Sequence, residues 1–230
     1  MSPYSKPPIL LIVPSRARPH NARALLDVWQ ATTEGHSGIV FCLDDDDPTT
    51  PEYPRDDCEV IIGPRKRLAG WTNTVAVARL DDHALFGSIG DDHRPESQGW
   101  ESAILDAVRL VDGPAIVYGD DGVHGEAIPT AFFVTSNIVR TVGGMGPPGV
   151  SHLFFDDWAR ELGRAAGCLR YLAGVKITHH HPLAGRAPMD QTYEDGGSNR
   201  VLWNADEVAF RAWMRDGLDG DAAKVRALRG

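Results

Sequence analysis

Apolar residues along this chain fall into short continuous runs, and these runs are separated by segments in which apolar residues recur every three or four positions. The short runs are typical of strands buried on both faces of a sheet, and the wider spacing is typical of one face of an α-helix. The predicted strands are 9–13, 39–43, 60–62, 84–89, 115–118, 131–134 and 175–178. The predicted helices are 22–29, 68–78, 100–108, 156–167 and a C-terminal helix that starts at Asn204, which with Glu207 resembles a capping box.

Strands that alternate with helices predict an α/β fold, with a mostly parallel sheet and helices on both of its faces. The length of 230 residues fits a single domain. We expect this domain to cover residues 1–195, and we expect a helical extension over 196–230, after a pair of glycines, that packs on it.

The composition is ordinary for a soluble globular protein, with 42% hydrophobic and 24% charged residues. The formal net charge of −9 argues against a broad nucleic-acid-binding face, which needs a basic patch. A small phosphate-bearing ligand is compatible with the basic groups at Arg16, Arg18 and 65–67. Neither of the usual phosphate-loop fingerprints, G-x-G-x-x-G or G-x-x-x-x-G-K-[ST], occurs in the sequence, so a nucleotide would have to be held in another way.

The cysteines and the N-terminal region indicate the compartment. The three cysteines, Cys42, Cys58 and Cys168, are odd in number and have no C-x-x-C spacing, which favours reduced thiols in a reducing cytosol. The longest apolar run near the N-terminus, 9–13, is too short for a signal-peptide core or a membrane span. We therefore expect a soluble, cytoplasmic protein with no membrane partner.

Three clusters of acidic or imidazole residues adjoin predicted elements: 91–93 (Asp-Asp-His) after strand 84–89, 156–157 (Asp-Asp) at a helix start, and 179–181 (His-His-His) after strand 175–178. Carboxylates and imidazoles bind divalent metals, and the carboxyl edge of an open α/β sheet is where ligands bind. The clusters therefore predict metal-assisted transfer on a phosphate-bearing substrate. Each cluster also has a purely structural interpretation: an acidic turn, a helix start favoured by its dipole, or surface histidines.

The order of these clusters resembles that of GT-A-fold glycosyltransferases, in particular the family 2-like enzymes that use nucleotide-diphosphate sugars. The resemblance covers roughly residues 8–190, and the small size of the chain suits a bacterial or phage member. Three motifs depart from the family: Asp-Asp-His replaces Asp-x-Asp, Asp-Asp replaces the commoner Glu-Asp at the helix start, and three histidines replace the single late histidine. The matching segments are Val13-Pro14-Ser15-Arg16, Leu43-Asp44-Asp45-Asp46, Gly90-Asp91-Asp92-His93, 143–149, Phe155-Asp156-Asp157 and His179-His180-His181.

The resemblance implies a site for Mn²⁺ or Mg²⁺ and a nucleotide-sugar donor, with a UDP-sugar as the commonest donor type. Side chains in a strand alternate between faces, so either His179 with His181, or His180 alone, faces the metal. His181 is the preferred histidine, and the participation of His93 is left open. The metal ligands that the resemblance implies are Asp92, Asp91, His181 and His179. The implied donor-binding residues are Pro14, Ser15, Arg16, Arg18, Asp44, Asp46, Arg65 and Asp91, and Arg186 is a further candidate for the diphosphate.

The resemblance also implies an inverting transfer in which an aspartate at the helix start removes a proton from the acceptor hydroxyl. Asp157 is the preferred base, because the family has its base at the second position of this motif, and Asp156 is its neighbour. The acceptor itself is not encoded in any motif, and the charge of −9 disfavours DNA as the acceptor. Three alternatives remain: a nucleotidyltransferase of the sugar-phosphate pyrophosphorylase type, a metal-dependent phosphoester hydrolase, and a non-catalytic nucleotide-sugar-binding module.

Overall fold

The fold is built on one eight-stranded sheet with the strand order β3-β2-β1-β4-β7-β6-β8-β5. A computed structural model of the chain describes residues 6–111, 113–196 and 199–229. Four of the seven neighbouring strand pairs are parallel, and the antiparallel pairs are β4–β7, β6–β7 and β5–β8. The strands are β1 (Ile9–Ser15), β2 (Ser37–Asp44), β3 (Glu59–Gly63), β4 (Leu85–Ser88), β5 (His93–Pro95), β6 (Ile116–Asp120), β7 (Phe132–Thr135) and β8 (Leu169–His179).

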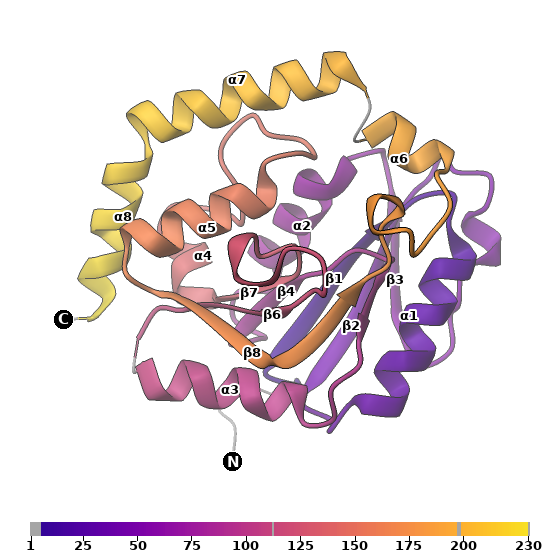
Figure 1. Cartoon of the computed structure of the whole chain (residues 1–230), viewed down its shortest axis with the longest axis horizontal. Helices are drawn as coiled ribbons and strands as arrows, with labels where there is room; N and C mark the ends of the chain where they lie inside the picture. Colours follow the sequence, from indigo (N-terminus) through magenta and orange to yellow (C-terminus); the bar gives the residue numbers. More distant parts are fainter. Residues whose placement is uncertain (1–5, 112, 197–198, 230) are drawn as a thin grey trace.

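Helices cover both faces of this sheet, as the alternating sequence pattern predicts (Figure 1). One apolar cluster joins alternate residues of β1, such as Leu10 and Ile12, to α2, α4 and α5. The other joins Ile9, Leu11 and Val13 of the same strand to α1 and α3. Because β1 is buried on both faces, its sequence is a continuous apolar run. The helices are α1 (Pro19–Thr32), α2 (Arg67–Ala78), α3 (Trp100–Val111), α4 (Ser136–Val142), α5 (Phe155–Ala165), α6 (Gln191–Gly196), α7 (Arg200–Asp216) and α8 (Leu218–Arg226).

The two C-terminal helices pack on the outer side of α4 and α5 (Figure 1). Trp213 of α7 and Val225 of α8 belong to the same apolar cluster as Trp158 of α5, and the ring centroids of Trp158 and Trp213 lie 6.5 Å apart. The expected boundary at 195/196 adjoins residues 197–198, which lie outside the described residues. Because α7 and α8 share an apolar cluster with α5, they pack against the rest of the chain and do not form a separate unit.

Several predicted boundaries are wrong. The C-terminal helix begins at Arg200 and not at Asn204, because the side chain of Asn199 caps it by accepting hydrogen bonds from the amides of Val201 and Leu202, both at 3.1 Å. The last strand is predicted at 175–178 but runs from Leu169 to His179. The apolar pattern does not indicate its first half, because these residues are exposed or half-buried and are not continuously apolar. The short elements β5 and α4 have no periodic apolar pattern and were not predicted.

Gly87 lies where β4 is most tightly packed between its neighbours. A Cβ atom at this position would lie 2.9 Å from Leu11 Cδ2 and 2.9 Å from Phe133 Cε1. We expect Gly87→Ala to lower the free energy of unfolding by about 1–3 kcal/mol, because the surrounding core has to move apart. Urea denaturation measures this effect. Gly38→Ala is the matched control, since its Cβ would make only an ordinary 3.9 Å contact with Leu10, and an equal loss in both variants would contradict the packing argument.

None of the helices in the described ranges has the length and apolar character that a membrane crossing requires. The three cysteines carry free thiols, and Cys42 and Cys168 are buried. Burial raises the pKa of the Cys42 thiol to about 12, so this cysteine is a small core residue and not a nucleophile.

Candidate functional site

A short antiparallel ladder brings two of the three sequence clusters together. β5 pairs with the end of β8, so that His93 lies directly opposite His179. The two imidazole rings stack with their centroids 4.1 Å apart and their planes 18° from parallel. The backbone amide of His180 also donates to the carbonyl of Asp92 at 2.8 Å. The Asp-Asp-His and His-His-His motifs therefore meet at one edge of the sheet, although His93 and His179 are 86 positions apart in the sequence. Arg94 and Thr178 form the next pair along the ladder.

Asp92, His93 and His179 form a cluster whose ligand atoms all lie within 4.8 Å of one another. Asp92 Oδ1 lies 3.1 Å from His93 Nδ1, and Asp92 Oδ2 lies 3.4 Å from His179 Nε2. Gly90 leaves space at the point where Asp92 and His93 converge, since a Cβ there would lie 2.5 Å from Asp92 Oδ1 and 2.9 Å from His93 Nδ1. One carboxylate and two imidazoles with such spacing are a suitable ligand set for a divalent metal.

The protonation states of this cluster also suit a metal. Burial raises the pKa of Asp92, but the imidazoles of His179 and His93 outweigh burial and hold this pKa well below its ordinary value. Burial lowers the pKa of His179, so its ring is neutral near pH 7. The Nδ1 atoms of His93 and His179 are buried and have no hydrogen-bond partner in the described part of the chain. Buried polar atoms without partners are rare, and a cation beside Asp92 would satisfy Nδ1 of His93, the nitrogen that faces this carboxylate.

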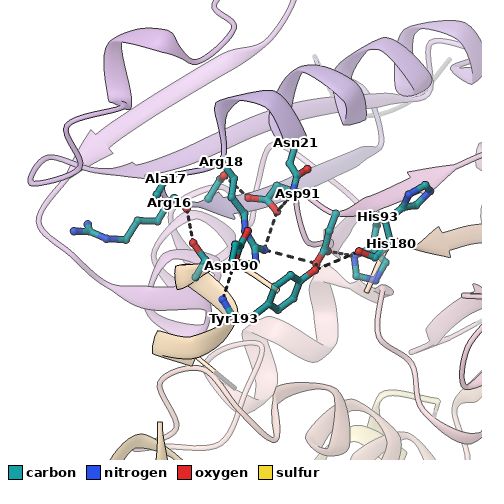
Figure 2. A network of polar contacts seen from close by, with 12 residues as sticks. Arg16, Ala17, Arg18, Asn21, Asp91, His93, His180, Asp190 and Tyr193 are labelled. Carbon is teal, nitrogen blue, oxygen red and sulfur yellow. Dashed lines mark hydrogen bonds and ion pairs between the residues drawn. The ribbon is translucent and has the colours of Figure 1, made fainter. Parts of the chain in front are cut away.

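Asp91 faces a different set of partners from Asp92. Its carboxylate accepts a short hydrogen bond from Ser15 Oγ and longer ones, at 3.5 Å, from Asn21 Nδ2 and Arg18 Nη1 (Figure 2). Burial, followed by the negative charge of Asp92, raises the pKa of Asp91. The structure therefore joins Asp91 to the end of β1 and the start of α1, and Asp91 does not belong to the three-residue cluster of Asp92, His93 and His179.

The segment that follows β8, from 182 to 196, returns to this site. The guanidinium of Arg18 donates to both carboxylate oxygens of Asp190, at 2.6 and 2.8 Å, and lies 3.9 Å above the ring of Tyr193 (Figure 2). The phenol of Tyr193 donates to Asp92 Oδ2 at 2.6 Å. Burial and the charge of Asp92 raise the pKa of Tyr193, so the phenol stays protonated and remains a donor. The ring of His181 packs edge-on against Tyr193 with centroids 4.9 Å apart.

A cavity of about 550 Å³ opens beside these residues. Asp92, His93, His179 and His181 all line it, whereas His180 is not among the residues that line it, which agrees with the predicted pairing of His179 with His181. Three residues predicted for the site do not line it: Asp46, Asp157 and Arg186, whose guanidinium instead donates to the carbonyl of Gly122 at 3.1 Å. The other predicted residues along its wall are Pro14, Ser15, Arg16, Arg18, Asp44, Arg65, Asp91 and Asp156.

At the end of the cavity near β2, the buried carboxylate of Asp44 contacts three other side chains. One oxygen of its carboxylate accepts a hydrogen bond from Trp71 Nε1 at 2.8 Å, and the other accepts from Arg16 Nη1 at 3.0 Å and lies 3.8 Å from Arg65 Nε. Arg16 also pairs closely with Asp46, whose side chain is 55% exposed. The two arginines therefore line the cavity with positive charge, and Asp46 serves as a surface partner of Arg16.

The two aspartates at the start of α5 have different surroundings. Asp156 lines the cavity, and burial, followed by the charge of Asp157, raises its pKa. Asp157 instead forms an ion pair with Arg160 of its own helix at 2.6 Å. A carboxylate that lines a cavity and has a raised pKa is suited to accept a proton, whereas an ion-paired one is not.

The loop that leads to Asp156 is held by the C-terminal helix α7. Asp206 is 1% exposed, and its two oxygens accept hydrogen bonds from the amides of residues 151, 152 and 153 at 2.8–2.9 Å and from the hydroxyl of Ser151 at 3.0 Å. The next residue, Phe154, has a left-handed backbone with φ of 60° and stacks on Phe210 of α7. The extension therefore fixes the loop that carries His152 and precedes Asp156.

We expect Asp206→Ala to lower the free energy of unfolding by about 2–4 kcal/mol, because it leaves several amide donors of the loop without an acceptor. Chemical denaturation measures the loss. Asp216→Ala is the matched control, since Asp216 lies on the surface of the same helix and, within the described residues, its carboxylate pairs only with its neighbour Arg215. If the two variants have the same stability, the loop does not depend on Asp206.

Sequence reasoning did not find Tyr193, Trp71, Thr130 or His152, although all four line the cavity. Tyr193 reaches Asp92 across 101 positions of the chain, and no local pattern encodes such a contact. The helical spacing of apolar residues places Trp71 on the apolar face of a helix, and its ring does pack there. Its indole nitrogen also donates a hydrogen bond to Asp44, which the spacing does not indicate. An aromatic residue with a polar atom on a core face was the only available signal.

No protein-family model matches this chain, and no curated protein matches it in sequence. Solved structures do match its fold. A mannosyltransferase from Pyrobaculum calidifontis, in complex with GDP-Man and Mn²⁺, is 12% identical and has a TM-score of 0.55, with 99% of this chain and 77% of that chain covered. Staphylococcus aureus TarS 1–349, in complex with UDP-GlcNAc, is 9% identical with a TM-score of 0.58, and the match covers 96% and 71% of the two chains.

A third match is the glucosyl-3-phosphoglycerate synthase of Mycobacterium tuberculosis, in complex with Mn²⁺, UDP-glucose and phosphoglyceric acid. It is 8% identical and has a TM-score of 0.61, and the match covers 87% of this chain and 79% of that chain. These likenesses confirm the predicted α/β architecture: the chain shares the GT-A fold of these three structures.

Proposed function

We propose that this protein is a metal-dependent glycosyltransferase that moves a sugar from a nucleotide-diphosphate sugar to an acceptor hydroxyl. The observation that carries this proposal is the cluster of Asp92, His93 and His179 beside a cavity lined by arginines, in a chain with the GT-A fold. Metal-dependent transfer needs a cation site next to a diphosphate site, and both kinds of side chain line this cavity.

The proposed metal ligands are Asp92, His93 and His179. The orphaned Nδ1 of His93 and the space left by Gly90 support a cation at this position. Carboxylates suit Mg²⁺ and Mn²⁺ alike, whereas imidazole ligands favour Mn²⁺ over Mg²⁺. When bound, the ion would neutralise charge on the leaving diphosphate. His181 lies next to His179 and Tyr193 on the same wall, and we retain it as a neighbour of the metal site.

The donor would lie along the wall from β1 to the start of α2. Arg16 and Arg65 are suited to hold the diphosphate or the ribose side of a nucleotide through charge-assisted hydrogen bonds. Asp44 holds both arginines, and Pro14 and Ser15 line the same wall. A UDP-sugar is our first candidate for the donor, although one of the structural neighbours was solved with a GDP-sugar.

We assign the general base to Asp156 and keep Asp157 as the alternative. In a single displacement, the acceptor oxygen bonds to the anomeric carbon while the bond from that carbon to the diphosphate oxygen breaks. The hydroxyl proton passes to the base, and the nucleoside diphosphate leaves with the electron pair. This step inverts the configuration at the anomeric carbon. The support for Asp156 is its position on the cavity wall and its raised pKa.

The proposal is tested by measuring the binding and slow hydrolysis of a panel of nucleotide sugars with and without Mn²⁺. Calorimetry measures binding, and chromatography of the nucleotide product measures slow hydrolysis of each donor. Metal-dependent binding of one donor would support the proposal and identify the substrate. Pyrophosphate release from a nucleoside triphosphate would favour a nucleotidyltransferase, and metal-dependent cleavage of simple phosphoesters would favour a hydrolase. Binding of a donor without any turnover, even with a range of acceptors, would favour a binding module.

A further inference from the structure

Arg67 lies at the start of α2 and lines the cavity, yet its guanidinium has no ion pair or hydrogen bond within the described residues. The other arginines of the cavity wall each face a carboxylate, which is Asp44 for Arg16 and Arg65, and Asp190 for Arg18. A guanidinium is always charged and has five N–H donors. Arg67 therefore brings uncompensated positive charge and unused donors to the cavity wall.

A backbone hydrogen bond connects the start of α2 to the loop that precedes α5. The amide of Ala69 donates to the carbonyl of Ser151 at 3.0 Å. This bond joins the segment of Arg67 to that of His152, which also lines the cavity. Burial and then the positive charge of Arg67 lower the pKa of His152 to about 4, so its ring is neutral near pH 7. The neutral imidazole has one N–H to donate, and its ring has no hydrogen bond in the described part of the chain.

A positive charge and hydrogen-bond donors without acceptors therefore meet on one wall of the cavity, and the oxygen atoms of an anion would satisfy them. We propose that Arg67 and His152 form a subsite for a phosphate or carboxylate group carried by the acceptor. The choice of the acceptor rests on the proposed function: the acceptor hydroxyl has to reach Asp156, which lies four positions after His152 and lines the same cavity. Asp206 holds the amide of His152 at 2.8 Å, so this side of the subsite is in place before a ligand binds.

Two other roles for Arg67 make different predictions. As a residue of the donor site, Arg67 would bind a phosphate of the nucleotide together with Arg16 and Arg65. As a solvated surface cation, it would bind no ligand with measurable affinity. An acceptor subsite, in contrast, binds a small anion while a nucleoside diphosphate and the metal are in place. Binding of a small anion to the chain with and without the nucleotide therefore distinguishes the three roles.

Titration calorimetry tests the subsite in the full chain alone and in the chain saturated with UDP and Mn²⁺. The probes are ethyl phosphate, propionate and the uncharged propanol. We expect at least one of the two anions to bind in both conditions, and propanol to bind in neither. Arg67→Gln is expected to raise the Kd of that anion about 10-fold or more, and His152→Gln about 2–10-fold. Arg109→Gln is the matched control with an expected change within about twofold, because the side chain of Arg109 is 73% exposed on α3 and is not part of the cavity wall.

Two results would overturn the proposal. An anion that binds the free chain but not the chain with UDP and Mn²⁺, or a higher Kd for UDP in Arg67→Gln, would assign Arg67 to the donor site. No binding of either anion, or the same Kd in the wild type and in a folded Arg67→Gln, would make Arg67 a solvated cation; melting followed by circular dichroism reports the folding. If no nucleoside diphosphate binds with Mn²⁺, the proposed function fails, whereas the titration of the free chain still decides whether Arg67 binds an anion.

Discussion

Substitution of Asp92 by Asn is expected to lower kcat/KM for sugar transfer by about 10³-fold or more and to abolish Mn²⁺ binding. Charge stabilisation by a metal contributes several kcal/mol to a transition state, and each 1.4 kcal/mol corresponds to a tenfold change in rate. Asp92 is the carboxylate on which His93, His179 and the phenol of Tyr193 converge. An amide at this position keeps the shape of the side chain but removes the negative charge that a divalent cation requires.

Three measurements on this variant separate a lost metal site from a lost fold. Calorimetry reports Mn²⁺ affinity, a product assay reports transfer, and thermal melting followed by circular dichroism reports folding. Asp81→Asn is the matched control, because the side chain of Asp81 is 90% exposed and its surface ion pair is with Arg140. Retention of Mn²⁺ affinity by a folded Asp92→Asn would remove this aspartate from the metal site.

Asp156→Asn is expected to lower kcat by about 10²–10⁴-fold while the affinity for the donor changes by less than about twofold. The base acts on the acceptor, so its loss slows the chemical step without removing a contact with the nucleotide. The raised pKa of Asp156 means that this carboxyl is protonated up to a higher pH than an ordinary aspartate. The wild-type rate should therefore rise with pH as Asp156 loses its proton, and this acidic limb of the kcat profile should disappear in the variant.

Asp157→Asn is the informative comparison, because it makes the same change at the next residue. Its ion pair with Arg160 is partly exposed, and such pairs contribute about 0–1 kcal/mol. We expect Asp157→Asn to retain most of its activity. A larger loss of kcat in Asp157→Asn than in Asp156→Asn would assign the base to the second aspartate, as the family resemblance implies.

Much of the sheet could be predicted from the sequence, because strands such as β1 and β2 are buried on both faces and have continuous apolar sequences. The β5 strand could not be predicted. It has only three residues, His93 to Pro95, and they are polar or proline, yet they are buried because β8 and Thr32 of α1 provide hydrogen-bond partners. The start of β8 could not be predicted either, because it is not buried. Pairing with β6 stabilises this half of the strand, and such pairing leaves no apolar pattern in the sequence.

Some residues of the candidate site could likewise be predicted from local sequence patterns, and others could not. Asp92 and Asp156 could be found because each follows a recognisable local pattern, a strand end or a helix start. The approach of Arg67 to His152 depends on the backbone hydrogen bond between Ala69 and Ser151, so it exists only once α2 has packed against the loop before α5. The choice between Asp156 and Asp157 likewise depends on which side of one helix turn faces the cavity, and this is set by packing.

Arg18 stabilises this site in the absence of a substrate. Its guanidinium is 6% exposed and lies 3.5 Å from Asp91 and 3.8 Å from Asp92, so it acts as an internal counter-ion for two buried carboxylates. Two such charges without compensation would favour protonation or local unfolding. With Arg18 in position, we expect the empty site to keep its shape at neutral pH. The fold around Asp91 and Asp92 would then not depend on a bound cation, because Arg18 already compensates their charge.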